Sequence, residues 1–500
     1  MNSTHTSPES DQWRREVIRQ HTILVYPFMA ESLRRPRRLG ERSRLAPHWE
    51  HWLLDKCRAA ASGDVGEQAD ISRIGDDSHF FLDHIRKLIL PEFDRRDGSP
   101  TTGLWSQPGI QDSLTRQALQ FEKHAARRTQ GTGPFRFRHS GELSIGTTRI
   151  PVLLGKTSRE FLFDLDYLDV CVFPDGQAFL LIRISNLTAG DGGSLDTWQV
   201  GDALRHLKRL QFRFRNIVDV PRFKLGDRLI TWGDVLDPAL KPFTAAISRA
   251  TEIGAESRFR AVSFAAIARD PTLRAPDPEE IFDSLRSRLL FELGTGHDTS
   301  YSQEVPSKQR MAEIQAANVE QWLNFSAFIF WDDATFFIED RRTYELSGSE
   351  IDVFAEITYP TQVENNFLWI YLLSCYQQQR SLAFVSRLSA LSLGKKADSV
   401  RAMAISDDFV RYRNLYNYRE ISRSQQGIAV HRGLTRLFEL NELEAAVSQQ
   451  LESATQHFTM LRAQRTEANE RAIRLAVALF GIVGVPASIV ASILASQLAQ

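Results

Sequence analysis

Charged residues are missing from the last 26 positions of this 500-residue chain, Leu475 to Gln500, although they make up 25% of the whole sequence. A helix needs roughly 20 apolar residues to cross the ~30 Å hydrocarbon core of a bilayer. The run therefore predicts a transmembrane helix at 475–498, and Pro486 near its middle is tolerated in membrane helices. A buried globular helix or an interfacial segment is the alternative, because serines dilute the hydrophobicity of the run.

Positive charge flanks this run on one side only. Arginines occupy positions 462, 465, 471 and 474, and no charge follows Arg474. The positive-inside rule then places the body of the protein in the cytoplasm and the C-terminus across the membrane. The N-terminus has no apolar core and is not a signal peptide. We therefore predict a bacterial inner-membrane protein with a single C-terminal span and a cytoplasmic N-terminus.

Cysteine is scarce. The three residues Cys57, Cys171 and Cys375 are widely spaced and odd in number, which argues against a disulfide framework. Cys171 and Cys375 lie in apolar runs, where a free thiol behaves as a small hydrophobic group. A reducing compartment suits such thiols.

Neither sign of charge prevails, since 61 basic and 62 acidic residues leave a net charge of −1. This balance excludes a general attraction to nucleic acid, so we expect no nucleic-acid partner. One short stretch is strongly basic and predicts either a solvated loop or a contact for an anionic partner. Its arginines are Arg34, Arg35, Arg37, Arg38, Arg42 and Arg44.

Recognisable catalytic motifs are also missing. The sequence contains no phosphate-binding loop of the Walker type, no His-Glu-x-x-His and no nucleophile elbow. We therefore expect no enzyme and no catalytic residues, and a tethered enzyme remains as a third hypothesis without residues to support it.

Evidence for a metal site is weak. Two histidine pairs, His48 with His51 and His79 with His84, have no cysteine or carboxylate at a suitable spacing. Three aspartates could offer oxygen ligands to a hard cation such as Mg²⁺: Asp164, Asp166 and Asp169. Strand alternation places the first two on one face and the third on the other, which favours a solvated face. Mg²⁺ stays open as a cofactor, with no assigned ligands.

Residues 1–20 are predicted to be disordered, and residues 21–340 to form an α/β cytoplasmic domain with a mixed sheet. The stretch Phe161–Asn186 predicts an antiparallel hairpin, because Pro174-Asp175-Gly176 between its two apolar halves suits a tight turn. A second strand pair is predicted at Trp322–Ile338, with Asp332-Asp333 as its turn.

Helices take over towards the C-terminus. We predict a helical domain at 359–433, a stalk helix at 434–474 and the membrane helix at 475–498. Apolar residues recur along the stalk in steps of three and four, a coiled-coil pattern that needs a partner helix. This oligomerisation seam consists of Leu440, Val447, Leu451, Ala454, Phe458 and Leu461. At 1.5 Å per residue the stalk is about 60 Å long.

The predicted span carries small and weakly polar residues, of which Gly484, Ser488, Ser492 and Ser496 recur every four positions. These residues let membrane helices pack tightly or line a narrow conduit, and the sequence is compatible with both roles. They are Gly481, Gly484, Pro486, Ser488, Ser492 and Ser496.

The order of elements resembles the CorA superfamily of divalent-cation transporters. Phe409–Glu452 resembles the region that enters the stalk in that family, and Leu475–Ala495 resembles its first membrane helix, with a proline near the middle. The resemblance implies a homo-oligomer, specifically a pentamer, formed through the stalk and first span. It also implies a cytoplasmic domain that binds a divalent cation or another small molecule.

The chain departs from that family at the ion-selecting loop. The family carries a Gly-Met-Asn signature after the first span, followed by a second span, and both are absent from this sequence. Ion selection by that loop therefore cannot be carried over. We expect a CorA-like homo-oligomeric inner-membrane protein, an ion-conducting channel or transporter gated through its cytoplasmic domain. The alternative is a membrane-tethered oligomeric scaffold or signal-responsive effector without transport.

Overall fold

The computed structural model describes residues 15–30, 49–52, 80–89, 134–139, 150–154, 159–211, 213–214, 217–218, 220–225, 227–243, 257–268, 278–298, 307–322, 325–340, 359–391 and 396–498. The chain divides into two compact units. The first comprises Met1–Tyr376 with Tyr418–Phe438, and the second comprises Gln377–Asn417 with Glu439–Gln500.

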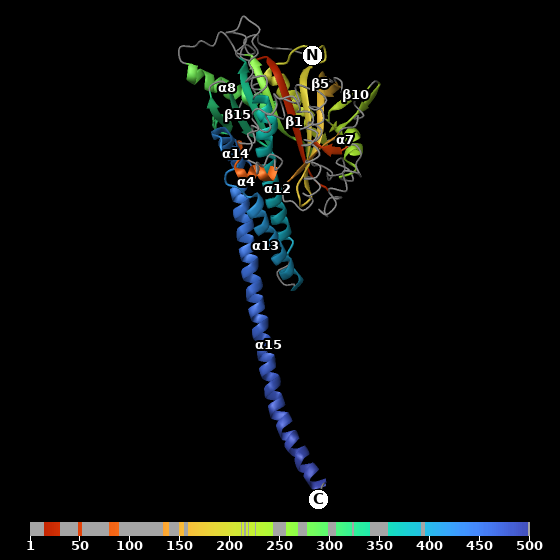
Figure 1. The fold of residues 1–500 in the computed structure, drawn as a ribbon, viewed down its shortest axis with the longest axis vertical. Coiled ribbons are helices and arrows are strands. Elements are labelled where there is room, and N and C mark those ends of the chain that lie inside the picture. The colour runs from red at the N-terminus through yellow and green to blue at the C-terminus, as the bar shows by residue number, and fades with distance from the viewer. Residues whose placement is uncertain are drawn as a thin grey trace, which may run out of the picture. The chain divides into compact units, whose positions relative to one another are not determined.

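A twelve-stranded mixed sheet organises the first unit (Figure 1). Its pairs are antiparallel except β13 with β16, which are parallel. In spatial order the strands are β11 (Arg228–Ile230), β10 (Arg222–Leu225), β4 (Ile150–Leu154), β5 (Arg159–Val172), β6 (Gln177–Ala189), β1 (Val17–Met29), β13 (Arg260–Ala268), β16 (Asp333–Asp340), β15 (Phe325–Phe330) and β14 (Asn318–Trp322). Strand β3 (Phe135–His139) joins β5 and β2 (Trp49–His51). The predicted α/β body with a mixed sheet is confirmed.

Both predicted hairpins occur in this sheet, β5–β6 near its middle and β16–β15 next to the edge strand β14. Strands β5 and β6 are joined at Pro174–Gly176, where Gly176 has a φ of 90° that suits glycine. Strands β15 and β16 are joined by Trp331 and Asp332, one residue earlier than predicted. Asp333 belongs to β16 instead, and its carboxylate accepts hydrogen bonds from Lys208 Nζ at 2.5 Å and Ala261 N at 2.7 Å.

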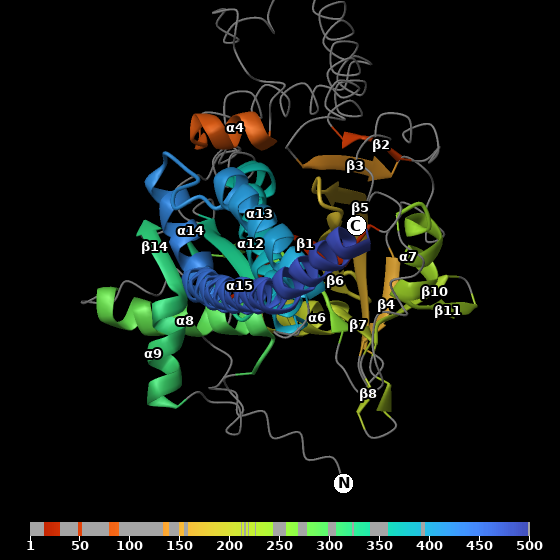
Figure 2. The ribbon, with the colours of Figure 1, turned by 90° about the horizontal axis from the view of Figure 1, so that it is seen from below.

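One face of the sheet carries the main apolar core of this unit. Helices α6 (Thr197–Leu207), α7 (Trp232–Leu240), α8 (Pro278–Thr295) and α9 (Lys308–Ala317) contribute to it, and Figure 2 shows α6 and α8 running along one side of the strands. Helices α6 and α8 approach closely at Gly201, where a Cβ atom would lie 2.0 Å from the Glu292 carbonyl oxygen. Glycine is therefore required at this crossing.

The opposite face is covered by a segment that contains a π-helix. It consists of α11 (Tyr359–Gln362), the π-helix η8 (Val363–Phe367) and the start of α12 (Leu368–Ser389). Phe367 stacks on Phe336 of β16 with ring centroids 4.7 Å apart, and Tyr376 stacks on Phe173 at 3.9 Å. Helices α14 (Gln425–Leu437) and α4 (Asp83–Ile89) complete this unit, and α14 packs against β14 and β15.

The second unit is helical. It contains the end of α12, α13 (Lys396–Tyr416) and the 59-residue α15 (Leu440–Leu498). Phe384 of α12 packs against Phe409 and Tyr412 of α13, with ring centroids 5.3 and 5.7 Å apart. The long helix starts at Leu440 rather than at residue 434, because Glu439 adopts a left-handed φ of 49° after α14.

Within the described part of the chain, no helix combines the length and the apolar character needed to cross a bilayer. The predicted transmembrane helix at 475–498 is therefore corrected, together with the inner-membrane location that depended on it. In the structure this segment continues α15, whose described side chains include charged residues as far as Arg474.

Candidate functional site

A β-bulge at Asp166 interrupts the alternation of side chains along β5. Leu165 pairs with Ile184 of β6, but the next pair joins Tyr167 to Arg183, so Asp166 is an extra residue. One extra residue reverses the face to which the following side chains point. The expectation that alternation separates the three aspartates is therefore wrong. All three lie on the face opposite the main core: Asp164, Asp166 and Asp169.

Two guanidinium groups form ion pairs with the buried carboxylate of Asp169. Arg136 Nε lies 2.7 Å from its Oδ2 atom, and Arg138 Nε lies 2.9 Å from its Oδ1 atom. Burial, the largest single effect, lowers the pKa of both arginines, but Asp169, Tyr167 and Glu364 together outweigh it and raise both above their ordinary value. The arginines also stack on rings, Arg136 on Trp52 at 4.6 Å and Arg138 on Tyr167 at 4.3 Å. A hard cation at Asp169 would face two positive charges, which opposes the Mg²⁺ site considered above.

A second ion-pair cluster connects the sheet to η8. Arg183 of β6 binds the bulged Asp166 through Nη1, and its Nε lies 3.2 Å from Glu364 Oε2 of the π-helix. Ser185 Oγ donates to Asp166 Oδ1 at 3.0 Å. Burial raises the pKa of Asp166, and this effect exceeds the opposing one of Arg183. π-helical turns are rare and often occur at functional sites; here the turn carries Glu364 to Arg183.

His21 lies in the same layer and is 2% exposed. Its ring stacks on Phe264 at a centroid distance of 5.2 Å, and its Nε2 atom has no hydrogen-bond partner. Burial, assisted by the nearby charge of Arg183, lowers the pKa of His21 to about 3. The buried Nδ2 atom of Asn366 in η8 also has no partner. Unpartnered buried groups of this kind carry a desolvation cost.

The charged side chains of this layer neutralise one another. Its carboxylates and guanidinium groups pair with one another: Asp166, Asp169 and Glu364 with Arg136, Arg138 and Arg183. Burial raises the pKa of Cys171 to about 12 and also raises that of Cys375. Neither thiol is ionised near neutral pH, so neither is an activated nucleophile. The layer holds strands and helix together.

The histidine pairs are not assembled into a metal site. His84 is exposed on α4 and its ring lies 4.9 Å from that of Tyr418. His48, His79 and the side chain of His51 lie outside the described residues, as does the arginine-rich stretch 34–44. Among the described residues, no group of three or more histidine, cysteine or acidic side chains could hold a metal ion.

The predicted oligomerisation seam on α15 begins in the interior of the protein. Helix α13 packs along the first part of α15, and Arg413 Nε lies 3.6 Å from Glu444 Oε1. Phe458 and Leu461 are half-buried. The four earlier seam residues are buried: Leu440, Val447, Leu451 and Ala454. Partner helices for the start of the seam therefore come from the chain itself.

Beyond this region α15 is open to solvent. Every described side chain from Ala463 to Ala478 is exposed, and Figure 1 shows α15 continuing past the end of α13 with no other helix of its unit beside it. Ile473 is 62%, Leu475 63% and Val477 65% exposed. Large apolar side chains that are exposed close together mark surfaces for interaction.

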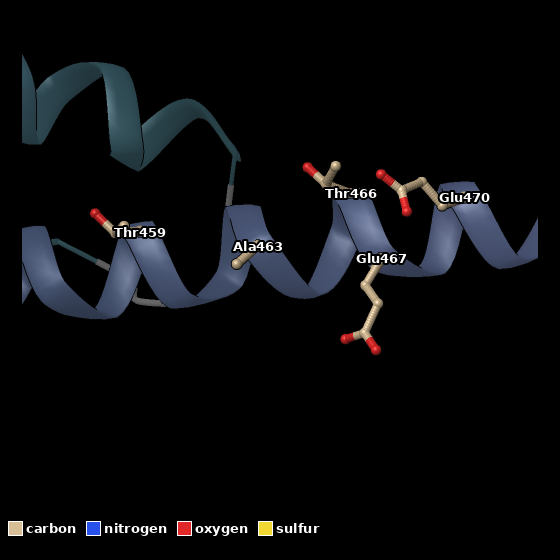
Figure 3. Close-up of a pocket in the computed structure, with 5 residues that line it drawn as sticks. All are labelled: Thr459, Ala463, Thr466, Glu467 and Glu470. Atoms are coloured by element: carbon tan, nitrogen blue, oxygen red, sulfur yellow. The ribbon is translucent and has the colours of Figure 1, made fainter.

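Two shallow grooves run along this surface. One lies on α15 alone (Figure 3) and is lined by Thr459, Ala463, Thr466, Glu467 and Glu470. The other is shared with Ser406 of α13, and its α15 residues are Leu451, Glu452, Thr455, Gln456, Thr459 and Met460. Thr459 belongs to both, so the two grooves are continuous. Of the residues that line the two grooves, the predicted seam included only Leu451.

The residues predicted to line a pore or pack helices are helical in backbone, but their side chains lie outside the described residues. They are Gly481, Gly484, Pro486, Ser488, Ser492 and Ser496. No protein-family model, curated protein or solved structure matches this chain. Both the roles of these residues and the CorA-like resemblance therefore remain predictions.

Proposed function

We propose that this protein is a homo-oligomeric scaffold in which α15 joins copies of the chain and the α/β body serves as a binding module. The proposal is carried by one observation: α15 exposes large apolar side chains where no helix of its own unit covers them. Fully burying a valine, leucine or isoleucine side chain contributes about 1.5–3 kcal/mol. Ile473, Leu475 and Val477 together therefore favour association of this helix.

The seven-residue repeat of α15 supports a second copy as the partner. Apolar residues occur at every seventh position of α15 from its start to residue 475, in the pattern typical of coiled coils: Leu440, Val447, Ala454, Leu461, Ala468 and Leu475. The chain covers the first three by itself. An isolated helix is marginal in water and gains most of its stability from packing. The last three are therefore available to another copy.

In this proposal the body binds rather than catalyses, in agreement with its protonated thiols and internally paired charges. The resemblance to the CorA superfamily supports a pentamer and a small-molecule or cation ligand for the body. A signal-responsive scaffold without transport combines these features.

Light scattering on the purified full-length chain tests the assembly role. We expect a mass several times that of the 56.9 kDa chain, and a marked decrease in Leu461→Glu, which places a charge in the seam. Gln464→Glu is the matched control, because Gln464 is exposed and lies outside the seam. A wild-type protein that stays monomeric at micromolar concentration would overturn the proposal.

A further inference from the structure

Helix α15 carries a second row of residues on a different face from the seam. Its members recur in steps of three and four: Thr455, Thr459, Ala463, Thr466, Glu470, Ile473 and Val477. With 3.6 residues per turn, this row lies roughly 150° around the helix axis from the row of Leu461, Ala468 and Leu475. In Figure 3, Thr459, Thr466 and Glu470 lie on one side of α15 and Glu467 points the other way.

The threonines make this second row more apolar than its composition suggests. Thr455 Oγ1 donates to the Leu451 carbonyl oxygen at 2.7 Å, and Thr459 Oγ1 donates to the Thr455 carbonyl oxygen at 2.8 Å. The hydroxyl groups are thus satisfied within the helix. Ala463 allows close approach of a neighbour, and the exposed Ile473 and Val477 extend the row.

The charges of the two rows favour packing of the seam of one copy against the second row of another. The three- and four-residue spacing of the seam continues beyond Leu461 through Arg465, Ala468, Ala472 and Leu475, so that this continuation contains one charged residue. Between the same limits the second row also contains one, Glu470. On a parallel neighbour in the same register, Glu470 lies five residues, about 7.5 Å along the axis, from position 465, an offset that a long arginine and a glutamate side chain can bridge. Two copies that pair the seam with the second row therefore place opposite charges together.

From these features we infer that each α15 packs its seam against the second row of a neighbouring copy, so that every helix contacts two others. This inference rests on the proposed self-assembly of α15 and specifies its geometry. A contact between unlike surfaces is heterologous and generates rings or larger assemblies, whereas a contact between like surfaces gives a two-fold dimer. The assembly therefore contains more than two copies.

Cysteine cross-linking separates these geometries. The double variant Leu461→Cys with Ala463→Cys carries one thiol on each row. Residues two apart on a helix do not face each other, so each disulfide must join two chains. We expect a ladder of dimers, trimers and larger species on a non-reducing gel, and no ladder from either single variant. Wild type controls for the native cysteines, and Gln464→Cys controls for random collision.

The outcomes distinguish the inference from the proposed function. A complete dimer from Leu461→Cys alone, with nothing larger in the double variant, would overturn the inference and leave self-assembly intact. No cross-link in any variant, together with a monomeric mass, would overturn both. A second test uses charge: Glu470→Arg should lower the assembled mass, and adding Arg465→Glu should restore it. A mass unchanged by Glu470→Arg would contradict the pairing of the two rows.

Discussion

Arg183 of strand β6 holds Glu364 of the π-helix η8, with its Nε atom 3.2 Å from Glu364 Oε2. Both side chains are mostly buried, at 20% and 19% exposure. The same guanidinium binds Asp166, the extra residue of the β5 bulge. One arginine therefore connects two strands of the sheet with the helix that covers them.

The first prediction concerns this connection. Glu364→Gln removes one charge from the cluster and should destabilise the protein by about 2 kcal/mol, because a partly buried guanidinium loses a charged partner. Urea unfolding measures the change. Glu313→Gln breaks the exposed Arg310–Glu313 pair and should cost less than about 1 kcal/mol. Equal effects of the two substitutions would contradict the role of Glu364.

The second prediction concerns pH. The pKa of His21 is about 3 in the folded protein and 6.5 ordinarily, so below pH 6.5 the unfolded chain binds a proton that the folded protein does not. Neutral His21 therefore makes its full contribution to the free energy of unfolding above pH 6.5, and this contribution is lost as the pH falls towards 3. The slope reaches about 1.4 kcal/mol per pH unit for one such group.

Urea unfolding between pH 6.5 and 4 tests this dependence. His21→Gln cannot titrate, so its stability should decline less steeply with falling pH than that of wild type. His431 adds to the remaining slope, because burial lowers its pKa to about 4. Identical slopes for wild type and His21→Gln would show that His21 is accessible to protons in the folded state.

The third prediction concerns the crossing of α6 and α8. In Gly201→Ala the new Cβ atom would lie 2.0 Å from the Glu292 carbonyl oxygen, so the two helices must separate. We expect a loss of about 3 kcal/mol, at the upper end for overpacking. Gly193→Ala is the control, since its Cβ would meet only the Asp191 carboxylate at 3.1 Å. A thermal melt compares the two, and equal midpoints would contradict the close packing.

Local signals predicted the two hairpins of the body. The turn at Pro174–Gly176 and the apolar runs around it are enough to specify the β5–β6 hairpin, because the residues that decide it are neighbours in sequence. The bulge at Asp166 could not be foreseen in the same way. It appears only when the register of β5 against β6 is known, and it brings to one face three aspartates that alternation would have separated.

Longer-range features left no signal in the sequence. Arg183 and Glu364 belong to segments far apart in the chain, and nothing near either residue indicates the other. The second row on α15 is different, because its spacing of three and four residues is visible from Thr455 to Val477. It was missed because threonine, alanine and glutamate do not form an apolar pattern until the threonine hydroxyls are seen to bond within the helix.

The sequence by itself determined the two hairpins, the helical C-terminal part and the seven-residue repeat of α15, since these depend on the periodicity of apolar residues and on local turn chemistry. Tertiary structure alone decided which surfaces are covered. Helix α13 packs along the part of α15 whose seam is buried as far as Ala454, and the described side chains from Ala463 to Ala478 are exposed. In the sheet, each buried charge described above finds its partner. Burial and ion pairing depend on which distant segments meet, and a linear pattern of residues does not contain that information.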